Sequence, residues 1–555
     1  MYRLAELQIS GEELALYVLA FGALGHHLPG MMRAYGDRDL FQRFRTRFVL
    51  APVFIGAVCV SFTLWNLSAI VLAVYLWGAW HGMMQSYGFV RIYDGKGGVF
   101  DRWTQKLDFA MCAAWFGAGV VLSPARFFKI LDLFHVRAGA PIPSGEVMHG
   151  FQALWAAGTA VITVLFLANL VRNVRAKRPI PWIKLTVLAT SIGLWWYSNV
   201  ATLNMLVGLA LFEVFHDVQY LSIVWIFNRA QVEKNPGTGG LTGWLFRRSG
   251  ILVGLYVGLV FAYGSIRFVA NGISSETLRA AMEGLIVGSA ILHFYYDGFI
   301  WKIRETKTRQ KMGLDGGNAH PTGKAEGMPP WMVHAGKWGL AVVPLVALGM
   351  AEPARRPGVF LRTEALAAQL PENPFAQKTC GDAFREVGRD RDALAKYRLA
   401  SQLGLDSAEL HHNTGVLLVR TGDGDAARSE FEAALAKRAL PESHVQLGNL
   451  AFAANLRDDA RDHWQTALRL DSRCAEAHHG MGRYFTTAGA LSDAVTSYQR
   501  AIECDPATAS TRFNLGAVLE ALQQPADALA AYQAALAIDP GLEPARARVA
   551  VLRSP

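Results

Sequence analysis

Histidine residues stand inside four apolar stretches of this sequence. They are His26 and His27 in FGALGHHLPG, His81 in LWGAWHGMM, His216 in LFEVFHDVQ and His293 in SAILHFYYD. Charged residue types within a membrane span cost roughly 2.5 to 3.5 kcal/mol each on insertion scales, so ionisable residues there are functional candidates. Imidazole is a good ligand for zinc, copper, iron and nickel. These five histidines are therefore the candidate metal ligands.

The histidines also share a depth along their stretches. Each precedes the first basic residue of the following loop by a similar number of positions; the extremes are His27, six before Arg33, and His216, thirteen before Arg229. At 1.5 Å per residue the candidate ligands lie about 9 to 20 Å from one boundary of the membrane. Unrelated core histidines would have no reason to agree in depth, so we expect one common site in the inner half of a helical bundle.

Carboxylates accompany two of these histidines. Glu213 stands three residues before His216, so both project from one helical face, and Glu-x-x-His is the spacing that di-iron carboxylate bundles use. Asp217 points elsewhere and could accept a hydrogen bond from an imidazole. Asp297 lies one turn after His293 and is expected to be a ligand, an orienting partner or a proton relay. Glu213 and Asp297 are the candidate catalytic residues.

Plainer interpretations of the same residues stay open. Buried histidines can serve as polar contacts between helices, or a pair of them can ligate haem. His26 or His27 could cap a span, and Asp297 could reach toward a basic loop.

Three tyrosines flank the layer of the candidate histidines: Tyr87, Tyr220 and Tyr296. Four further histidines are expected to be ordinary solvated residues: His135, His149, His320 and His334.

The elements that must position these residues are predicted to be membrane-spanning helices. Runs long enough to cross about 30 Å of hydrocarbon indicate nine or ten spans within residues 1–351. They lie near residues 14–32, 48–65, 68–89, 108–124, 147–171, 183–198, 202–227, 250–270, 279–300 and 331–351.

Basic residues cluster in alternate connections, which predicts that these connections are cytoplasmic and that the N-terminus lies outside. The tenth run is the weakest, because Trp338 to Ala351 is short and contains Pro344. If it spans, the remainder of the chain lies on the outer, periplasmic side of the plasma membrane. If it is re-entrant, the remainder is cytoplasmic.

The C-terminal third has an internal repeat. Glycines recur at spacings of 33 or 34 residues, each followed twelve residues later by Ala, and then by an aromatic residue and a second Ala. The glycines are Gly381, Gly415, Gly448, Gly482 and Gly516, and the aromatic residues are Tyr397, Phe431, Trp464, Tyr498 and Tyr532. Small residues let two helices approach, and a period of 34 is typical of paired helices stacked in an array.

This pattern resembles the tetratricopeptide repeat family, with five repeats. The resemblance implies an α-solenoid over residues 374–555, ending in a capping helix, with a concave face that binds a protein or peptide partner. A packing or dimerisation role is the alternative. Residues 352–373 are then a linker, and the fold class is all-α: a polytopic membrane bundle followed by a solenoid.

Composition excludes several classes of protein. Of 555 residues, 52% are hydrophobic and 18% charged, too apolar for one soluble single-domain enzyme. The net charge of +9 follows from basic loops in a membrane protein, so no nucleic-acid partner is expected. Five cysteines without CxxC spacing indicate neither a disulfide framework nor a zinc site.

The membrane half distantly resembles the histidine-dependent integral-membrane non-haem iron enzymes, such as the bacterial carotene-cleaving dioxygenases. The likeness consists of single histidines spread over several spans. It implies iron and a lipophilic substrate. The sequence departs from the membrane desaturase and hydroxylase pattern, because it has no HxxxH or HxxHH box.

The leading hypothesis is therefore a membrane metal-dependent oxidoreductase or oxygenase that acts on a lipophilic substrate in contact with membrane lipid, with the solenoid as a docking arm. One alternative is a non-catalytic, membrane-anchored scaffold. Another is a membrane glycosyltransferase with tetratricopeptide repeats. That class needs paired acidic residues in its first outside loop, whereas Asp37 and Asp39 are expected inside.

Overall fold

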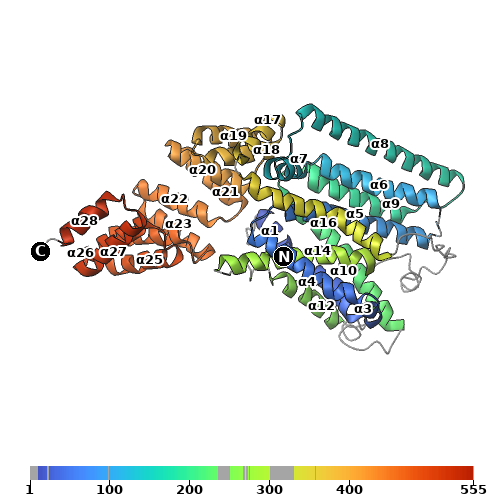
Figure 1. The fold of residues 1–555 in the computed structure, drawn as a ribbon, viewed down its shortest axis with the longest axis horizontal. Helices are drawn as coiled ribbons and strands as arrows, with labels where there is room; N and C mark the ends of the chain where they lie inside the picture. Colours follow the sequence, from blue (N-terminus) through green and yellow to red (C-terminus); the bar gives the residue numbers. More distant parts are fainter. Residues whose placement is uncertain are drawn as a thin grey trace. The chain divides into compact units, whose positions relative to one another are not determined.

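The computed structural model describes residues 11–19, 21, 24–97, 99, 101–234, 250–266, 269, 273, 275–300, 330–356 and 358–553. These residues form helices and turns without a strand, in agreement with the all-α prediction (Figure 1). They divide into two compact units. The first unit, here called the bundle, comprises Leu14–Ala383 with Gln402–Leu405. The second unit, here called the solenoid, consists mainly of Phe384–Ser401 and Asp406–Pro555.

The bundle has described helices that range from 5 residues in η3 to 31 residues in α8. Its elements are α1 (Gly11–Val18), α2 (His27–Gly36), α3 (Arg38–Arg43), α4 (Arg45–Leu64), α5 (Ala69–Lys96), α6 (Arg102–Val121), α7 (Pro124–Leu131), η2 (Asp132–Arg137), α8 (Gly145–Arg175), α9 (Trp182–Trp196), η3 (Tyr197–Ala201), α10 (Met205–Lys234), α12 (Gly250–Gly264), α14 (Glu276–Ile300), α16 (Pro330–Arg355), α17 (Val359–Gln369) and α18 (Pro374–Glu386). Helix α17 occupies part of the segment expected as a linker.

Helices α4 and α14 approach each other closely because glycines line their contact. A Cβ added at Gly284 would lie 2.6 Å from the Cα of Val60, and one at Gly288 would lie 3.7 Å from the Cα of Gly56. Small residues at such crossings let helix backbones come together, as in membrane helix pairs. The contact fixes α14, which carries His293 in its next turn.

The prediction of nine or ten spans is wrong for the part of the chain that the structure describes. Three helices there are long and apolar enough to cross a membrane: α4, α8 and the part of α10 at Leu206–Ile226. A fourth is possible if α6 and the segment Pro124–Arg137, bent by 74°, count as one span.

The overcount has two physical causes. Helix α9 has 15 residues, so it rises only about 22 Å, less than the hydrocarbon core. Helix α5 is long enough, but its Trp, Gly, His and Gln residues make it less apolar than a span. Freedom from charge alone therefore overestimates the number of spans.

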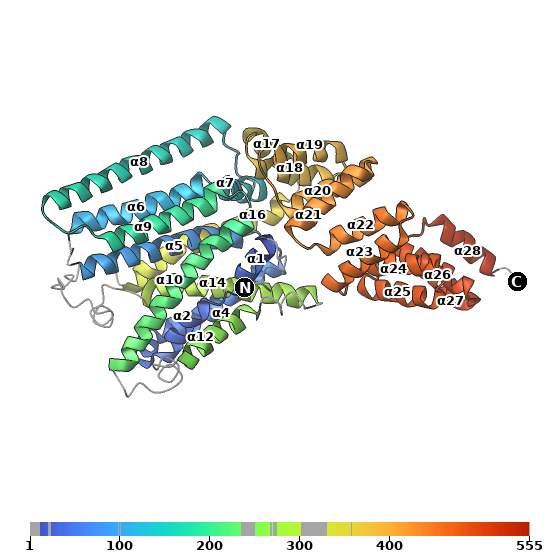
Figure 2. The same cartoon turned by 180° about the vertical axis from the view of Figure 1, so that it is seen from behind.

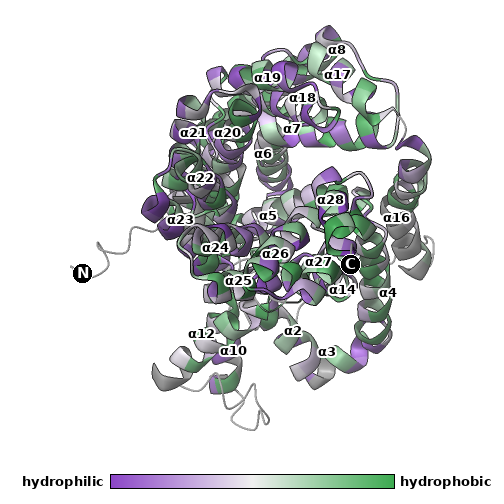
Figure 3. Cartoon of the chain, turned by 90° about the vertical axis from the view of Figure 1, so that its left-hand side faces the viewer, coloured by the Kyte–Doolittle hydropathy of each residue, from purple (hydrophilic) through white to green (hydrophobic). Residues whose placement is uncertain are grey.

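The candidate spans α4 and α8 present apolar side chains outward. Val53 on α4 and Leu154 on α8 are 70% and 73% exposed, and hydrophobic residues follow α4 in Figure 3. Large exposed apolar surfaces of this kind mark contacts with membrane or protein.

A buried ion network joins α5, α6 and α9. Lys184 Nζ lies 3.0 Å from Asp94 Oδ1 and 2.7 Å from Asp108 Oδ1, and Arg91 pairs with both carboxylates. Lys184 and Arg91 lie within helices, where the aspartates neutralise their charges.

The solenoid consists of antiparallel helix pairs (Figure 2). Its helices are α19 (Asp390–Gln402), α20 (Ala408–Thr421), α21 (Gly424–Lys437), α22 (Pro441–Ala453), α23 (Arg457–Leu470), α24 (Ala475–Thr487), α25 (Leu491–Cys504), α26 (Ala509–Ala521), α27 (Pro525–Ile538) and α28 (Glu543–Arg553). The division between the two units falls inside the first expected repeat.

Glycine and aromatic residues meet within four of the repeats. A Cβ at Gly415, Gly448, Gly482 or Gly516 would lie 2.5 to 2.7 Å from the ring of Phe431, Trp464, Tyr498 or Tyr532, respectively. These rings are almost fully buried. The glycine is therefore needed for the aromatic ring to pack against the first helix of its own repeat.

Candidate metal centre

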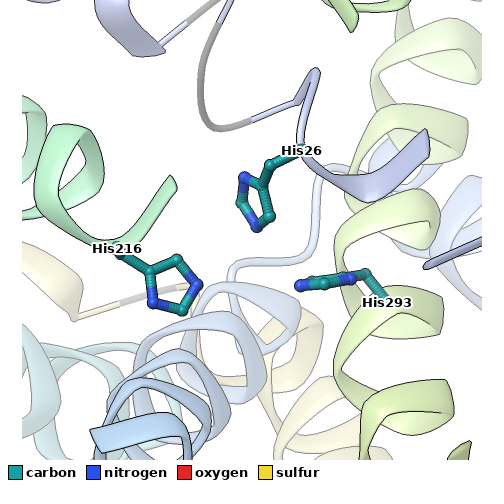
Figure 4. Close-up of side chains that lie close together, drawn as sticks. All are labelled: His26, His216 and His293. Atoms are coloured by element: carbon teal, nitrogen blue, oxygen red, sulfur yellow. The ribbon is translucent and has the colours of Figure 1, made fainter. Parts of the chain in front are cut away.

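Five histidines from four helical segments of the bundle converge. His26 precedes α2 directly and His27 begins it, while His81, His216 and His293 lie on α5, α10 and α14. All five are buried, with exposures between 1% and 8%. In Figure 4 the rings of His26, His216 and His293 turn toward one another across a small space.

The imidazole rings form a continuous cluster. The ring centroids of His26 and His293 are 4.7 Å apart, and those of His81 and His293 are 4.8 Å apart. His216 lies 5.2 Å from both His26 and His81, and His27 lies 4.9 Å from His293. Below, this group is called the histidine cluster.

Three carboxylates border the cluster. Asp217 Oδ1 is 2.7 Å from His26 Nδ1, and Asp297 Oδ2 is 3.7 Å from His293 Nε2 and 3.9 Å from His81 Nε2. Glu213 belongs to the same region, because it, Asp217 and His26 offer ligand atoms within 4.8 Å of one another.

Two further sets meet the same 4.8 Å limit: His26 with His216 and His293, and His81 with His293 and Asp297. Ligand atoms around one transition-metal ion each lie about 2.0 to 2.2 Å from it. Sets this compact need only small side-chain rotations to surround an ion.

Buried ring nitrogens in the cluster lack hydrogen bonds. Among the described residues, His81 Nε2 and both ring nitrogens of His293 are buried without a hydrogen-bond partner. A buried polar group left unsatisfied costs about 1 to 3 kcal/mol. A metal ion would take the lone pair of one ring nitrogen in each imidazole, so the residues present fit a metal.

Polar side chains behind the cluster fix its geometry. His27 Nδ1 lies 3.1 Å from Ser289 Oγ, which in turn is 2.8 Å from the Tyr263 hydroxyl. The Tyr220 hydroxyl donates to Asp297 Oδ1 at 3.0 Å. Hydrogen bonds of this kind orient the ligands of metal sites.

A close approach of α2 completes the wall of the cluster. A Cβ on Gly30 would lie 2.7 Å from the Tyr220 hydroxyl and 3.5 Å from His293 Nδ1. Only glycine leaves room there for both side chains.

A buried guanidinium lies on α7, beyond the carboxylate side of the cluster. Arg126 is 7% exposed, its Nε donates to Asn199 Oδ1, and it stacks over the rings of Trp195 and Tyr75. Sequence reasoning missed the burial of Arg126. It also missed Ser289, although its position one turn before His293 was a signal for a supporting residue.

The other residues singled out in the sequence lie apart from the cluster. The Tyr296 hydroxyl pairs with that of Tyr35 at 2.8 Å, and Tyr87 packs on Phe109. His149 is exposed on α8, and His135 Nδ1 lies 3.3 Å from the Ala140 carbonyl. His320, the side chain of His334, and that of Asp39 are outside the described residues. Asp37 caps α3 by accepting a hydrogen bond from the Leu40 amide.

The solenoid has ionisable pairs of its own. His411 lies between Glu430, 2.6 Å from its Nδ1, and Asp406, 3.0 Å from its Nε2; hydrogen bonding to Glu430 raises the pKa of His411. His444 Nδ1 lies 3.1 Å from His463 Nδ1, and burial followed by repulsion from His463 lowers the pKa of His444 to about 4.

Comparisons with known proteins match the C-terminal repeats. A tetratricopeptide repeat family model matches residues 445–509 and 492–543. Similar solved structures include YrrB, a tetratricopeptide repeat protein with an unusual peptide-binding site. It is 22% identical, with 33% of this chain and 96% of that chain covered and a TM-score of 0.27.

Two further solved structures resemble this chain to a similar degree. A thermophilic tetratricopeptide repeat protein of Thermus thermophilus is 19% identical, covering 32% of this chain and 98% of its own, with a TM-score of 0.29. PilW, a type IV pilus biogenesis factor, is 18% identical. The match covers 40% of this chain and 99% of PilW, with a TM-score of 0.32.

No curated protein matches the chain. The expected resemblance of the bundle to membrane non-haem iron enzymes finds no support in these comparisons. The C-terminal region of the chain carries tetratricopeptide repeats.

Proposed function

We propose that the bundle is a membrane metalloprotein whose histidine cluster holds one transition-metal ion or a pair, with iron as the favoured metal. His26, His27, His81, His216 and His293 supply imidazoles, and Glu213 and Asp297 supply carboxylates. The reaction class is oxidation or oxygenation of a lipophilic substrate. The solenoid is the docking arm for a protein or peptide partner.

One observation carries this proposal above all others. Histidines from four segments far apart in sequence meet in one buried cluster, and ring nitrogens of His81 and His293 have no hydrogen-bond partner among the described residues. Histidines that serve only as polar contacts between helices would hydrogen-bond to neighbouring helices. Buried imidazoles that gather without hydrogen bonds to other helices favour a ligand set.

The residues around the cluster suit redox chemistry on an apolar molecule. A bound transition metal supplies Lewis acidity and, for iron or copper, redox capacity. The chain excludes water by burying every histidine of the cluster. Tyr220 and Asp297 form a hydrogen-bonded pair that can hold a proton beside His293.

A plasma-membrane location belongs to the same proposal. The apolar helices α4, α8 and α10 are the candidate spans, and they would give a lipophilic substrate access from the bilayer. We propose that the N-terminus and the solenoid lie on the outer side.

A membrane-anchored scaffold without catalysis is the second candidate. It is favoured by the tetratricopeptide repeats, whose architecture serves protein binding. In a scaffold the histidines stabilise the bundle only.

Metal analysis of the full-length protein, purified in detergent from cells grown with iron, separates the two candidates. The metalloprotein should retain stoichiometric metal, and His81→Ala, His216→Ala and His293→Ala should each lose most of it while still inserting and purifying. His149→Ala is the matched control and should keep its metal, because His149 is exposed and outside the cluster. A wild-type protein without stoichiometric transition metal would leave the scaffold as the better account.

A further inference from the structure

A polar cavity of about 220 Å³ lies in the bundle, away from the histidine cluster. Its lining residues come from the α4–α5 turn, the end of η2, the end of α16 and the start of α17: Asn66, Ser68, Arg137, Glu352, Arg356 and Val359. A single water needs only about 10 to 15 Å³ of such space. The cavity therefore has room for a small molecule or a headgroup.

Glu352 supplies a buried negative charge to this cavity. It is 6% exposed, and both carboxylate oxygens accept from Ser68, one from the backbone amide at 2.8 Å and one from the hydroxyl. Ser68 precedes α5, so the carboxylate sits favourably at a helix N-terminus. The two hydrogen bonds from Ser68 satisfy part of the hydrogen-bonding capacity of the Glu352 carboxylate. Glu352 has no ion pair with a described residue, and a buried charge without a cation is costly.

Two guanidinium groups supply positive charge to the same cavity. Arg356 donates to the Trp65 carbonyl at 3.3 Å and forms no ion pair with a described residue. Arg137 Nε lies 3.7 Å from Asp132 and is buried without a hydrogen bond. Neither arginine comes within ion-pair distance of Glu352, so the two kinds of charge face the cavity separately.

The cavity is placed at the end of a candidate span. Helix α4 ends at Leu64, and Asn66, with φ of 51°, turns the chain toward α5. Trp65 between them is 68% exposed. Tryptophan is enriched at the boundary between membrane and water, where lipid headgroups lie.

We propose that this cavity binds a zwitterion with a phosphate and a primary ammonium group, as in the ethanolamine phosphate headgroup of a phospholipid. Arg137 and Arg356 bind the phosphate, because guanidinium forks match its oxygens. Glu352 accepts N–H hydrogen bonds from the ammonium. A trimethylated ammonium has no such donor, so choline headgroups bind more weakly.

The test is native mass spectrometry of the full-length protein titrated with phosphatidylethanolamine, phosphatidylcholine and phosphatidylglycerol of identical acyl chains. Wild-type protein should retain the ethanolamine lipid about tenfold better than the choline lipid, the value of one charge-assisted hydrogen bond. Mono- and dimethylated ethanolamine lipids should fall between them. Equal retention of the ethanolamine and choline lipids by the wild-type protein would overturn the proposal.

Substitutions then locate the site. Glu352→Gln should abolish the preference for ethanolamine over choline and keep binding of phosphatidylglycerol, whereas Arg356→Gln should weaken all three lipids. Arg45→Gln, an exposed arginine at the opposite end of α4, is the control and should change nothing. Unchanged selectivity in Glu352→Gln, together with undiminished lipid binding in Arg356→Gln, would overturn the assignment to this cavity.

Competition by soluble phosphoethanolamine identifies the source of the ligand. Full displacement of the lipid would assign the cavity to the free zwitterion, and no displacement would assign it to the membrane lipid. Metal content measured on the same samples should be unaffected by Glu352→Gln, so failure of this proposal and failure of the metal proposal are distinguishable.

Discussion

At the scale of single residues, the carboxylates divide the histidine cluster into two groups. Asp297 belongs with His81 and His293, whereas Glu213 and Asp217 belong with His26. Two-metal sites hold their ions about 3.5 to 4 Å apart. Two groups of ligands side by side are the arrangement that such a pair of ions needs.

Glu213→Gln tests whether there are two ions. Glutamine keeps the size and a carbonyl oxygen but removes the anionic ligand, so metal content should fall from about two ions to about one per chain, the outcome for a two-metal site. Glu233→Gln is the matched control on the same helix, because Glu233 is exposed and pairs with Arg229 away from the cluster. Equal metal in wild type and Glu213→Gln would indicate a centre held by the histidines without Glu213.

At the scale of elements, close helix contacts in both units depend on glycine. Gly284 admits the backbone of α4 against α14, and Gly448 admits Trp464 against α22. In the bundle this contact sets the position of α14 and its histidine. In the solenoid such a contact sets the packing of four helix pairs.

Gly448→Ala should loosen one repeat of the solenoid. Its Cβ would lie 2.6 Å from Trp464 Nε1, and overpacking a tight core costs about 1 to 3 kcal/mol. Hydrogen exchange of the full-length protein should show faster exchange in α22 and α23, because exchange reports local opening. Gly424→Ala is the control, since its Cβ would meet Leu450 at an ordinary 3.8 Å. Similar exchange in the two variants would argue against the glycine–aromatic contact.

At the scale of the whole molecule, the two units differ in how far their sequence predicts them. The solenoid is a local pattern: Gly448 and Trp464 are 16 residues apart and touch, so their spacing alone indicates the helix pair. The bundle joins distant segments. The length of an apolar run does not give the length of the helix, which is why α9 was counted as a span.

The sequence predicts the histidine cluster in part, better than the rest of the bundle and less fully than the solenoid. A shared depth was enough to expect His81, His216 and His293 at one level of the bundle. It could not show that Asp217 contacts His26, or that Ser289 supports His27, because those contacts depend on how α2 packs against α10 and α14. Side-chain partners across helices require the tertiary structure.

X-ray absorption at the metal edge of the purified full-length protein tests the central claim most directly, because it reads the ligands as well as the metal. The account predicts several imidazole nitrogens and carboxylate oxygens at about 2.0 to 2.2 Å and no sulfur. The imidazole scattering should weaken in His293→Ala and stay unchanged in His149→Ala. A metal bound through sulfur, or a wild-type protein without a metal edge, would contradict it.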